Sequence, residues 1–92
     1  MPCRYGSRPD QRLRIEFVEA DFEIGFNLVD IAEGESIQAH HAAAERALTD
    51  AEDVFSDIKH RLEILGVSES IPFQPLVGEL RRAIDLAKTH NS

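Results

Sequence analysis

The sequence predicts an all-α fold, a three-helix antiparallel bundle in which a helical hairpin is followed by a third helix and the central helix is the longest. One observation is a heptad repeat of apolar residues between Ser36 and Leu65. Another is the composition: the chain is 42% hydrophobic but has few aromatic residues, with five Phe, one Tyr and no Trp. Ala, Leu, Ile and Val therefore dominate, as suits packing between helices.

The N-terminal residues differ in charge from the rest of the chain. Residues 1–14 carry a net charge of +3, whereas residues 15–92 carry −10. Two prolines and a Gly-Ser pair interrupt residues 1–9, so we expect a flexible basic N-terminal arm there. Residues 10–92 are expected to form a single helical domain, since 92 residues leave no room for two.

Residues 10–33 predict a helix with two apolar stripes on nearly opposite faces. A strand competes locally, since Leu13, Ile15 and Phe17 alternate with polar residues, but no turn signal divides the segment and Gly34 follows it. The first stripe consists of Leu13, Phe17, Ala20, Ile24, Leu28 and Ile31. The second stripe consists of Ile15, Val18, Phe22, Phe26 and Val29.

Residues 36–65 give the clearest signal in the chain. Apolar positions recur there at alternating spacings of four and three, which defines the heptad seam. Its members are Ile37, His41, Ala44, Leu48, Ala51, Phe55, Ile58, Leu62 and Leu65. We expect Ser36 to cap the start of this helix, and Gly66 to end it in a left-handed conformation with an apolar contact from Val67.

A third helix is predicted over residues 74–89. Pro72 and Pro75 stop the preceding helix and place a proline in the first turn of the next one. Its apolar stripe consists of Val77, Leu80, Ile84 and Ala87.

The second stripe of the first helix is the predicted interaction face. Two neighbouring helices cover one broad side of a helix, so one of two opposed stripes should stay open in a monomer. A second copy of the chain or a helical partner protein would then cover Ile15, Val18, Phe22, Phe26 and Val29, with Gly25 allowing a close approach. The alternative is that the other two helices straddle the first and cover both stripes.

The segment Gly34-Glu35-Ser36-Ile37-Gln38-Ala39 resembles the turn of a single tetratricopeptide-repeat helical hairpin. In that family a glycine opens the turn and an alanine packs the second helix close to the first. The resemblance covers one hairpin and implies two antiparallel helices joined by a short turn.

No residue pattern in the chain indicates catalysis, a cofactor or a metal site. Two groups have ligand-like spacing on a helix: His40 and His41 with Glu45, and Asp57 with His60. The Glu-x-x-His pairs of bundle di-metal sites are absent from the sequence, and so are glycine-rich phosphate loops. Ordinary surface and seam positions therefore explain these side chains better than metal binding does.

Taken together, these features predict a non-enzymatic helical protein–protein interaction module that associates with itself. The single cysteine, Cys3, favours a reducing cytoplasmic location, and no apolar run is long enough for a membrane span. The alternative function is a nucleic-acid-associated regulator that makes contacts through Arg4, Arg8 and Arg12 of the arm.

Overall fold

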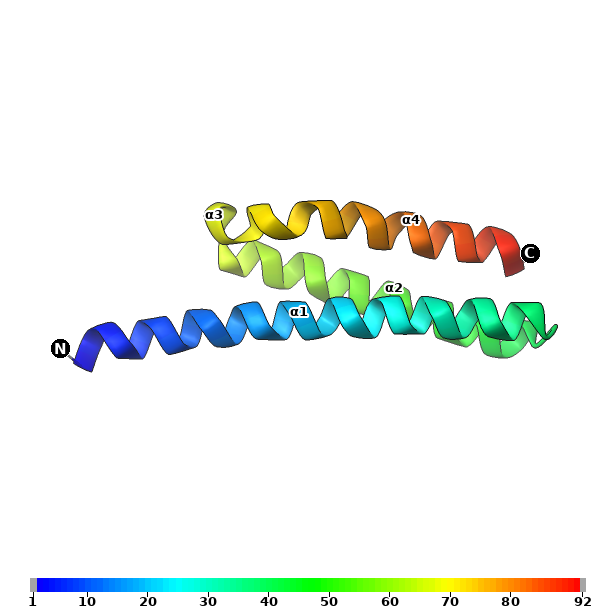
Figure 1. Ribbon diagram of the computed structural model, residues 1–92, viewed down its shortest axis with the longest axis horizontal. Coiled ribbons are helices and arrows are strands. Elements are labelled where there is room, and N and C mark those ends of the chain that lie inside the picture. Colours follow the sequence, from blue (N-terminus) through cyan, green and yellow to red (C-terminus); the bar gives the residue numbers. More distant parts are fainter. Residues whose placement is uncertain (1, 92) are drawn as a thin grey trace.

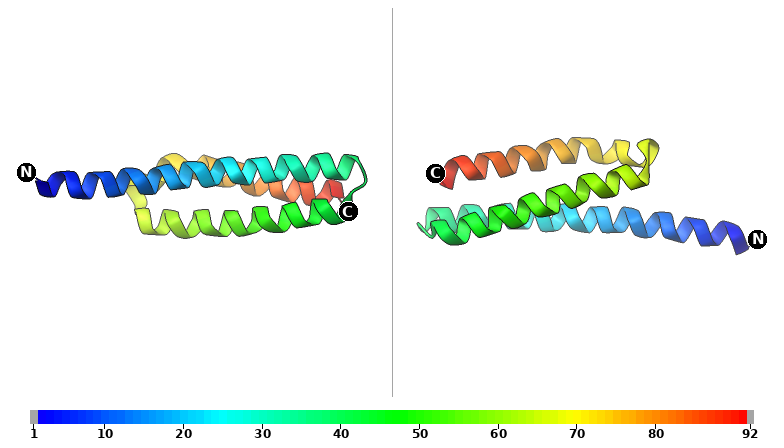
Figure 2. Two further views of the ribbon diagram at one scale, coloured as in Figure 1. Left: turned by 90° about the horizontal axis from the view of Figure 1, so that it is seen from below. Right: turned by 180° about the vertical axis from the view of Figure 1, so that it is seen from behind.

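The chain folds as an elongated bundle of three long helices. The computed structural model describes the backbone of residues 2–91 and the side chains of residues 12–91. Helix α1 spans Pro2–Ile37, α2 spans His41–Leu65 and α4 spans Gln74–Asn91, with the one-turn helix α3 (Val67–Ser70) and the 3-10 helix η1 (Ile71–Phe73) before α4. Helix α2 runs antiparallel to both α1 and α4 (Figures 1 and 2). The predicted all-α bundle is confirmed, and residues 2–91 contain no strand.

Helix α1 is longer than predicted at both ends. It continues through Gly34 to Ile37, and the strand-like alternative near residue 13 is wrong. It begins at Pro2, so the backbone of residues 2–9 is helical where the sequence analysis expected an irregular arm. This first part of α1 projects beyond the ends of the other helices (Figure 1). The division into an arm and a single domain stays a prediction.

The turn between α1 and α2 closes α1 with a Schellman motif. The His40 N–H donates to Glu35 O at 2.7 Å, and the Ala39 N–H donates to Ser36 O at 3.0 Å. Ala39 has φ 64°, the left-handed conformation that usually selects glycine at this position. Helix α2 therefore starts at His41, with His40 as its N-cap residue. The predicted cap Ser36 lies inside α1 instead, where its Oγ donates to Asn91 Oδ1 at 2.7 Å.

The heptad seam of α2 forms the centre of the core. Its seven members from Ala44 to Leu65 are all buried. The two remaining members are exceptions, because Ile37 belongs to the end of α1 and is 86% exposed, and His41 in the first turn of α2 is also exposed. Tertiary burial of the seam thus begins at Ala44, about two turns later than its sequence spacing indicates.

The link between α2 and α4 is helical rather than extended. Gly66 has φ 97° and ψ 170°, so its φ is positive as predicted, but its ψ lies outside the left-handed helical region. Val67 is exposed and does not make the expected apolar contact. Phe73 is buried instead, and its ring stacks on Phe22 of α1 with centroids 6.0 Å apart. This contact joins η1 to α1.

Helix α4 packs against both α1 and α2 and buries most of its predicted stripe. Leu80, Ile84 and Ala87 are buried, and Val77 is partly buried. Leu80 lies close to Gly25 of α1: a Cβ added at Gly25 would be 2.9 Å from Leu80 Cδ2. Gly25 therefore admits a side chain of the same chain, and not the backbone of a second copy as the sequence analysis expected.

Candidate interaction face on helix α1

The predicted interaction face of α1 is covered within the chain, which corrects the sequence analysis. Val18, Phe22 and Val29 are buried in the core, and Ile15 and Phe26 are partly buried against it. The cause is the position of α2 and α4, which both pack on this side of α1. The second stripe is therefore the inner face of α1 and is not available to a partner.

The first stripe is the one that stays open. Four of its five large residues are about half exposed: Leu13 49%, Phe17 52%, Ile24 48% and Ile31 54%. The fifth, Leu28, is partly buried against the core. Ala20 between them is exposed as well. The expectation that one stripe of α1 remains uncovered is thus met, but by the opposite stripe, and the alternative in which both stripes are covered does not occur. Four half-exposed large apolar side chains along one helix form a larger apolar patch than isolated surface residues do.

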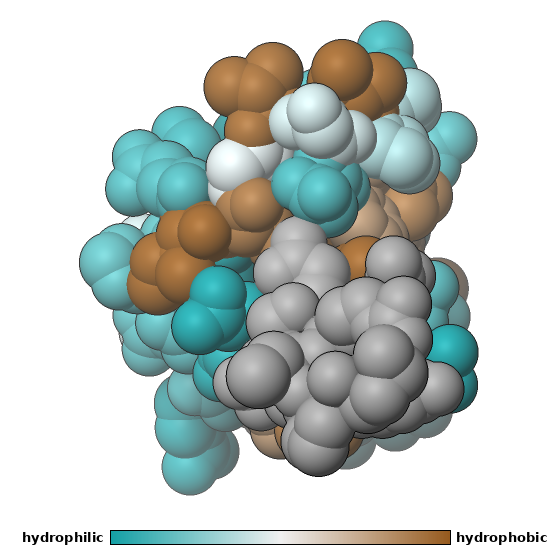
Figure 3. All heavy atoms as spheres, turned by 90° about the vertical axis from the view of Figure 1, so that its left-hand side faces the viewer, coloured by the Kyte–Doolittle hydropathy of each residue, from teal (hydrophilic) through white to brown (hydrophobic). Residues whose placement is uncertain are grey.

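Helix α2 borders the exposed stripe along one edge. The Arg61 guanidinium lies over the Phe17 ring, 5.4 Å from its centroid, and it forms an ion pair with Asp21, with Nε 2.8 Å from Oδ2. Ile64, one turn further along α2, is 54% exposed. Exposed apolar side chains also gather at this end of the bundle around α3, where Val67 and Ile71 lie (Figure 3).

Acidic side chains follow the other edge of the stripe. Glu16, Glu23 and Asp30 are exposed, and none of them forms an ion pair with a side chain of residues 12–91. Each directly precedes a large apolar residue of the stripe. The apolar residues of this stripe were identified from the sequence, but the interaction face was predicted on the second stripe. The repeated acidic neighbour is the signal that marks the first stripe as the outer one.

The predicted arm contacts are only partly described. Arg12 is exposed. The side chains of Arg4 and Arg8 lie outside the described residues. Nothing in the structure brings Arg12 together with the stripe.

A network of charged side chains joins α2 to α4 away from this face. Arg81 donates from Nη1 and Nη2 to the two carboxylate oxygens of Glu52, each at 2.9 Å, and its Nη2 also donates to Asp85 at 2.7 Å. Lys88 contacts Glu52 too. These hydrogen bonds, first that from Arg81 and then that from Lys88, lower the pKa of Glu52 to about 2. The network links α4 to α2 at the surface of the bundle.

Each histidine that the sequence singled out has a polar neighbour in the structure. His40 lies 3.4 Å from Glu35, His41 Nδ1 donates to Asn91 Oδ1 at 2.9 Å, and His60 lies 3.9 Å from Glu63. Neither group that the sequence singled out comes together around a point, and no three metal-ligating side chains cluster among the described residues.

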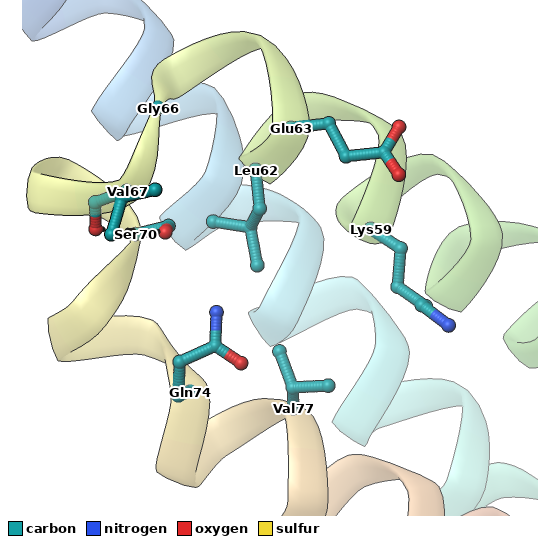
Figure 4. A pocket seen from close by; sticks show the side chains of 8 residues that line it. All are labelled: Lys59, Leu62, Glu63, Gly66, Val67, Ser70, Gln74 and Val77. Atoms are coloured by element: carbon teal, nitrogen blue, oxygen red, sulfur yellow. Dashed lines mark hydrogen bonds between the residues drawn. The ribbon is translucent and has the colours of Figure 1, made fainter.

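A hollow between the end of α2, α3 and the start of α4 is lined by Leu62 and Val77 (Figure 4). Lys59, Glu63 and Gln74 also line it. In residues 12–91, no buried polar side-chain atom lacks a hydrogen-bond partner.

In the part of the chain that the structure describes, no helix is long and apolar enough to cross a membrane. In comparisons with known proteins, no family model, curated protein or solved structure matches this chain.

Proposed function

We propose that this protein is a non-enzymatic helical interaction module, and that it binds a helix of its partner along the first stripe of α1. The observation that carries the proposal is the half exposure of Leu13, Phe17, Ile24 and Ile31 on one face of one helix. A reducing cytoplasmic location, expected from the single cysteine, is part of the proposal. The resemblance of the α1–α2 turn to a tetratricopeptide-repeat hairpin is part of the proposal as well.

The support for this face is that it is both apolar and rigidly held. Behind it, Val18, Phe22 and Val29 anchor α1 to α2 and α4 along most of the stripe. A helix that is already formed and fixed loses little further conformational entropy when a partner binds. Apolar side chains repeated at helical spacing are the contacts that one helix offers to another.

The nucleic-acid alternative has less support from the described surface. Three of the six basic side chains in residues 15–92 are engaged by acids: Arg61 by Asp21, and Arg81 and Lys88 by Glu52. The exposed row beside the stripe is acidic, which repels phosphate. Residues 15–92 therefore favour a protein partner, either a second copy of the chain or another helical protein.

Site-specific photo-crosslinking in the cells that make the protein tests the proposal. A benzoyl-phenylalanine replaces Phe17 or Ile24 in the stripe, or Leu86, a control that is 57% exposed on α4. We expect discrete protein adducts from positions 17 and 24 and none from position 86. The same adducts from all three positions, or adducts from none, would show that the stripe is not an interaction face.

A further inference from the structure

We infer that the exposed stripe of α1 takes a basic amphipathic helix from another protein rather than a second copy of this chain. This inference rests on the proposed function and adds the chemistry of the partner. It comes from a pattern in which an acid precedes an apolar residue every seven positions: Glu16-Phe17, Glu23-Ile24 and Asp30-Ile31.

This pattern matches one half of a two-helix coiled coil. Phe17, Ile24 and Ile31 occupy one core position of three successive heptads, and Leu13, Ala20 and Asn27 occupy the other. All six are exposed. The acids then stand at the position beside the core, where charges select the partner and its direction. Asn27 and the small Ala20 leave room for larger apolar side chains from a second helix.

Self-pairing places acids against acids in both directions. In a parallel pair, the flanking position of one helix faces the position five residues further along the other. Asp30 would therefore face a second Glu35, Glu16 would face a second Asp21, which Arg61 pairs, and Glu23 would face a second Leu28 and gain no ion pair. In an antiparallel pair the acidic rows themselves meet, with Glu23 near a second Glu23. Like charges at these positions select against a partner. A second copy therefore fits the stripe poorly.

A basic helix satisfies the same positions. Residues 15–37 of α1 contain seven acids and no basic residue, and the whole chain carries a net charge of −7. A partner helix with Leu or Ile in its core positions and Lys or Arg in the flanking ones would cover the apolar residues. It would also neutralise Glu16, Glu23 and Asp30. The acidic surface would speed its association at low salt.

Two synthetic helical peptides of about three to four heptads test the inference. Both carry Leu in the core positions and a fluorescein label; one has Lys in the flanking positions and the other has Glu. Fluorescence anisotropy measures binding to the full chain, with the peptide dilute enough to stay monomeric. We expect the Lys peptide to bind about tenfold more tightly than the Glu peptide, since three exposed ion pairs replace three repulsions.

Two variants and one control assign the binding to the stripe. Replacing Glu16, Glu23 and Asp30 together by Lys should reverse the preference, so that the Glu peptide binds more tightly. Ile24→Glu should abolish binding of both peptides, whereas the control Leu86→Glu on α4 should leave it unchanged. Circular dichroism establishes that each variant is as helical as the wild type.

The outcomes separate the inference from the proposed function. Equal binding of the two peptides, or a preference that the triple Lys variant leaves unchanged, would overturn the inference. So would sedimentation of the wild type as a dimer that Ile24→Glu dissociates, although the stripe would then still be an interaction face. The proposed function fails with the inference only when the photo-crosslinks at positions 17 and 24 are also absent or are the same as those at position 86.

Discussion

Replacing Gly25 by alanine should destabilise the fold, although Gly25 lies inside a helix. An alanine in a helix interior is more favourable than a glycine by about 0.8–1.0 kcal/mol. At Gly25, however, the new Cβ would lie 2.9 Å from Leu80 Cδ2 and 3.6 Å from Val54 Cγ1. Ordinary contacts between carbon atoms are about 3.5–4.0 Å. Leu80 is fully buried and cannot turn away, so we expect an overpacking cost of about 1–3 kcal/mol and a net loss of up to about 2 kcal/mol.

Two other helical glycines are matched controls for this prediction. A Cβ added at Gly34 of α1 or Gly78 of α4 meets nothing within 4 Å, so alanine there should stabilise the protein by about 0.5–1 kcal/mol. Urea unfolding followed by circular dichroism gives the three free energies of unfolding. If Gly25→Ala stabilises the protein as much as the two controls do, the close packing of α4 on α1 is wrong.

Three further outcomes are expected from unfolding measurements. Ala39→Gly should stabilise the protein by about 0.5–1 kcal/mol by relieving the left-handed conformation at the end of α1, and a lower melting temperature would contradict the Schellman turn. Phe55→Ala, in the buried seam, should cost about 3–5 kcal/mol, whereas Phe17→Ala on the open stripe should cost less than about 1 kcal/mol; similar losses would refute the assignment of inner and outer faces. The pKa of Glu52 is about 2, below its ordinary value of 4.5. The stability that its ion pairs contribute is therefore fully present above pH 4.5 and is lost as the pH falls toward 2. The wild type should therefore lose about 1–2 kcal/mol more than Glu52→Gln between pH 6 and 2, and parallel losses would refute this coupling.

The spacing of apolar residues predicted the helices well, because a helix that buries one face must carry its apolar residues at helical spacing. The seam of α2 and the stripe of α4 follow the sequence spacing, since each helix has a single apolar face that must meet a neighbour. The ends were predicted less well. The sequence analysis expected Gly34 to end α1, yet the chain turns at Ala39, a residue with no special preference for positive φ. Hydrogen bonds from His40 and Asn91 at this end hold a conformation that local propensity does not select.

The charged network was beyond sequence reasoning for a different reason. Glu52 and Arg81 are 29 residues apart, and each alone is an ordinary polar residue on a helix surface. Only the register of α4 against α2 brings them together. That register is set by buried contacts such as Leu80 on Gly25, whose tightness a sequence does not display.

The choice between the two stripes of α1 was decided by small residues. The core side of α1 includes Val18, Phe22, Gly25, Val29 and Ala32, all buried, and their spacings of four and three match the seam of α2 without a break. In the sequence, Gly25 was interpreted as the place where a second copy comes close and Ala32 was left out of the stripe, yet these two small residues let the other helices of the same chain come close enough to bury the rest. The opposite stripe loses this regularity at Asn27 and carries an acid beside each heptad. In a three-helix bundle both neighbours of a helix lie on one side of it, so the stripe with the small residues turns inward and the stripe with the charged border is left for a partner.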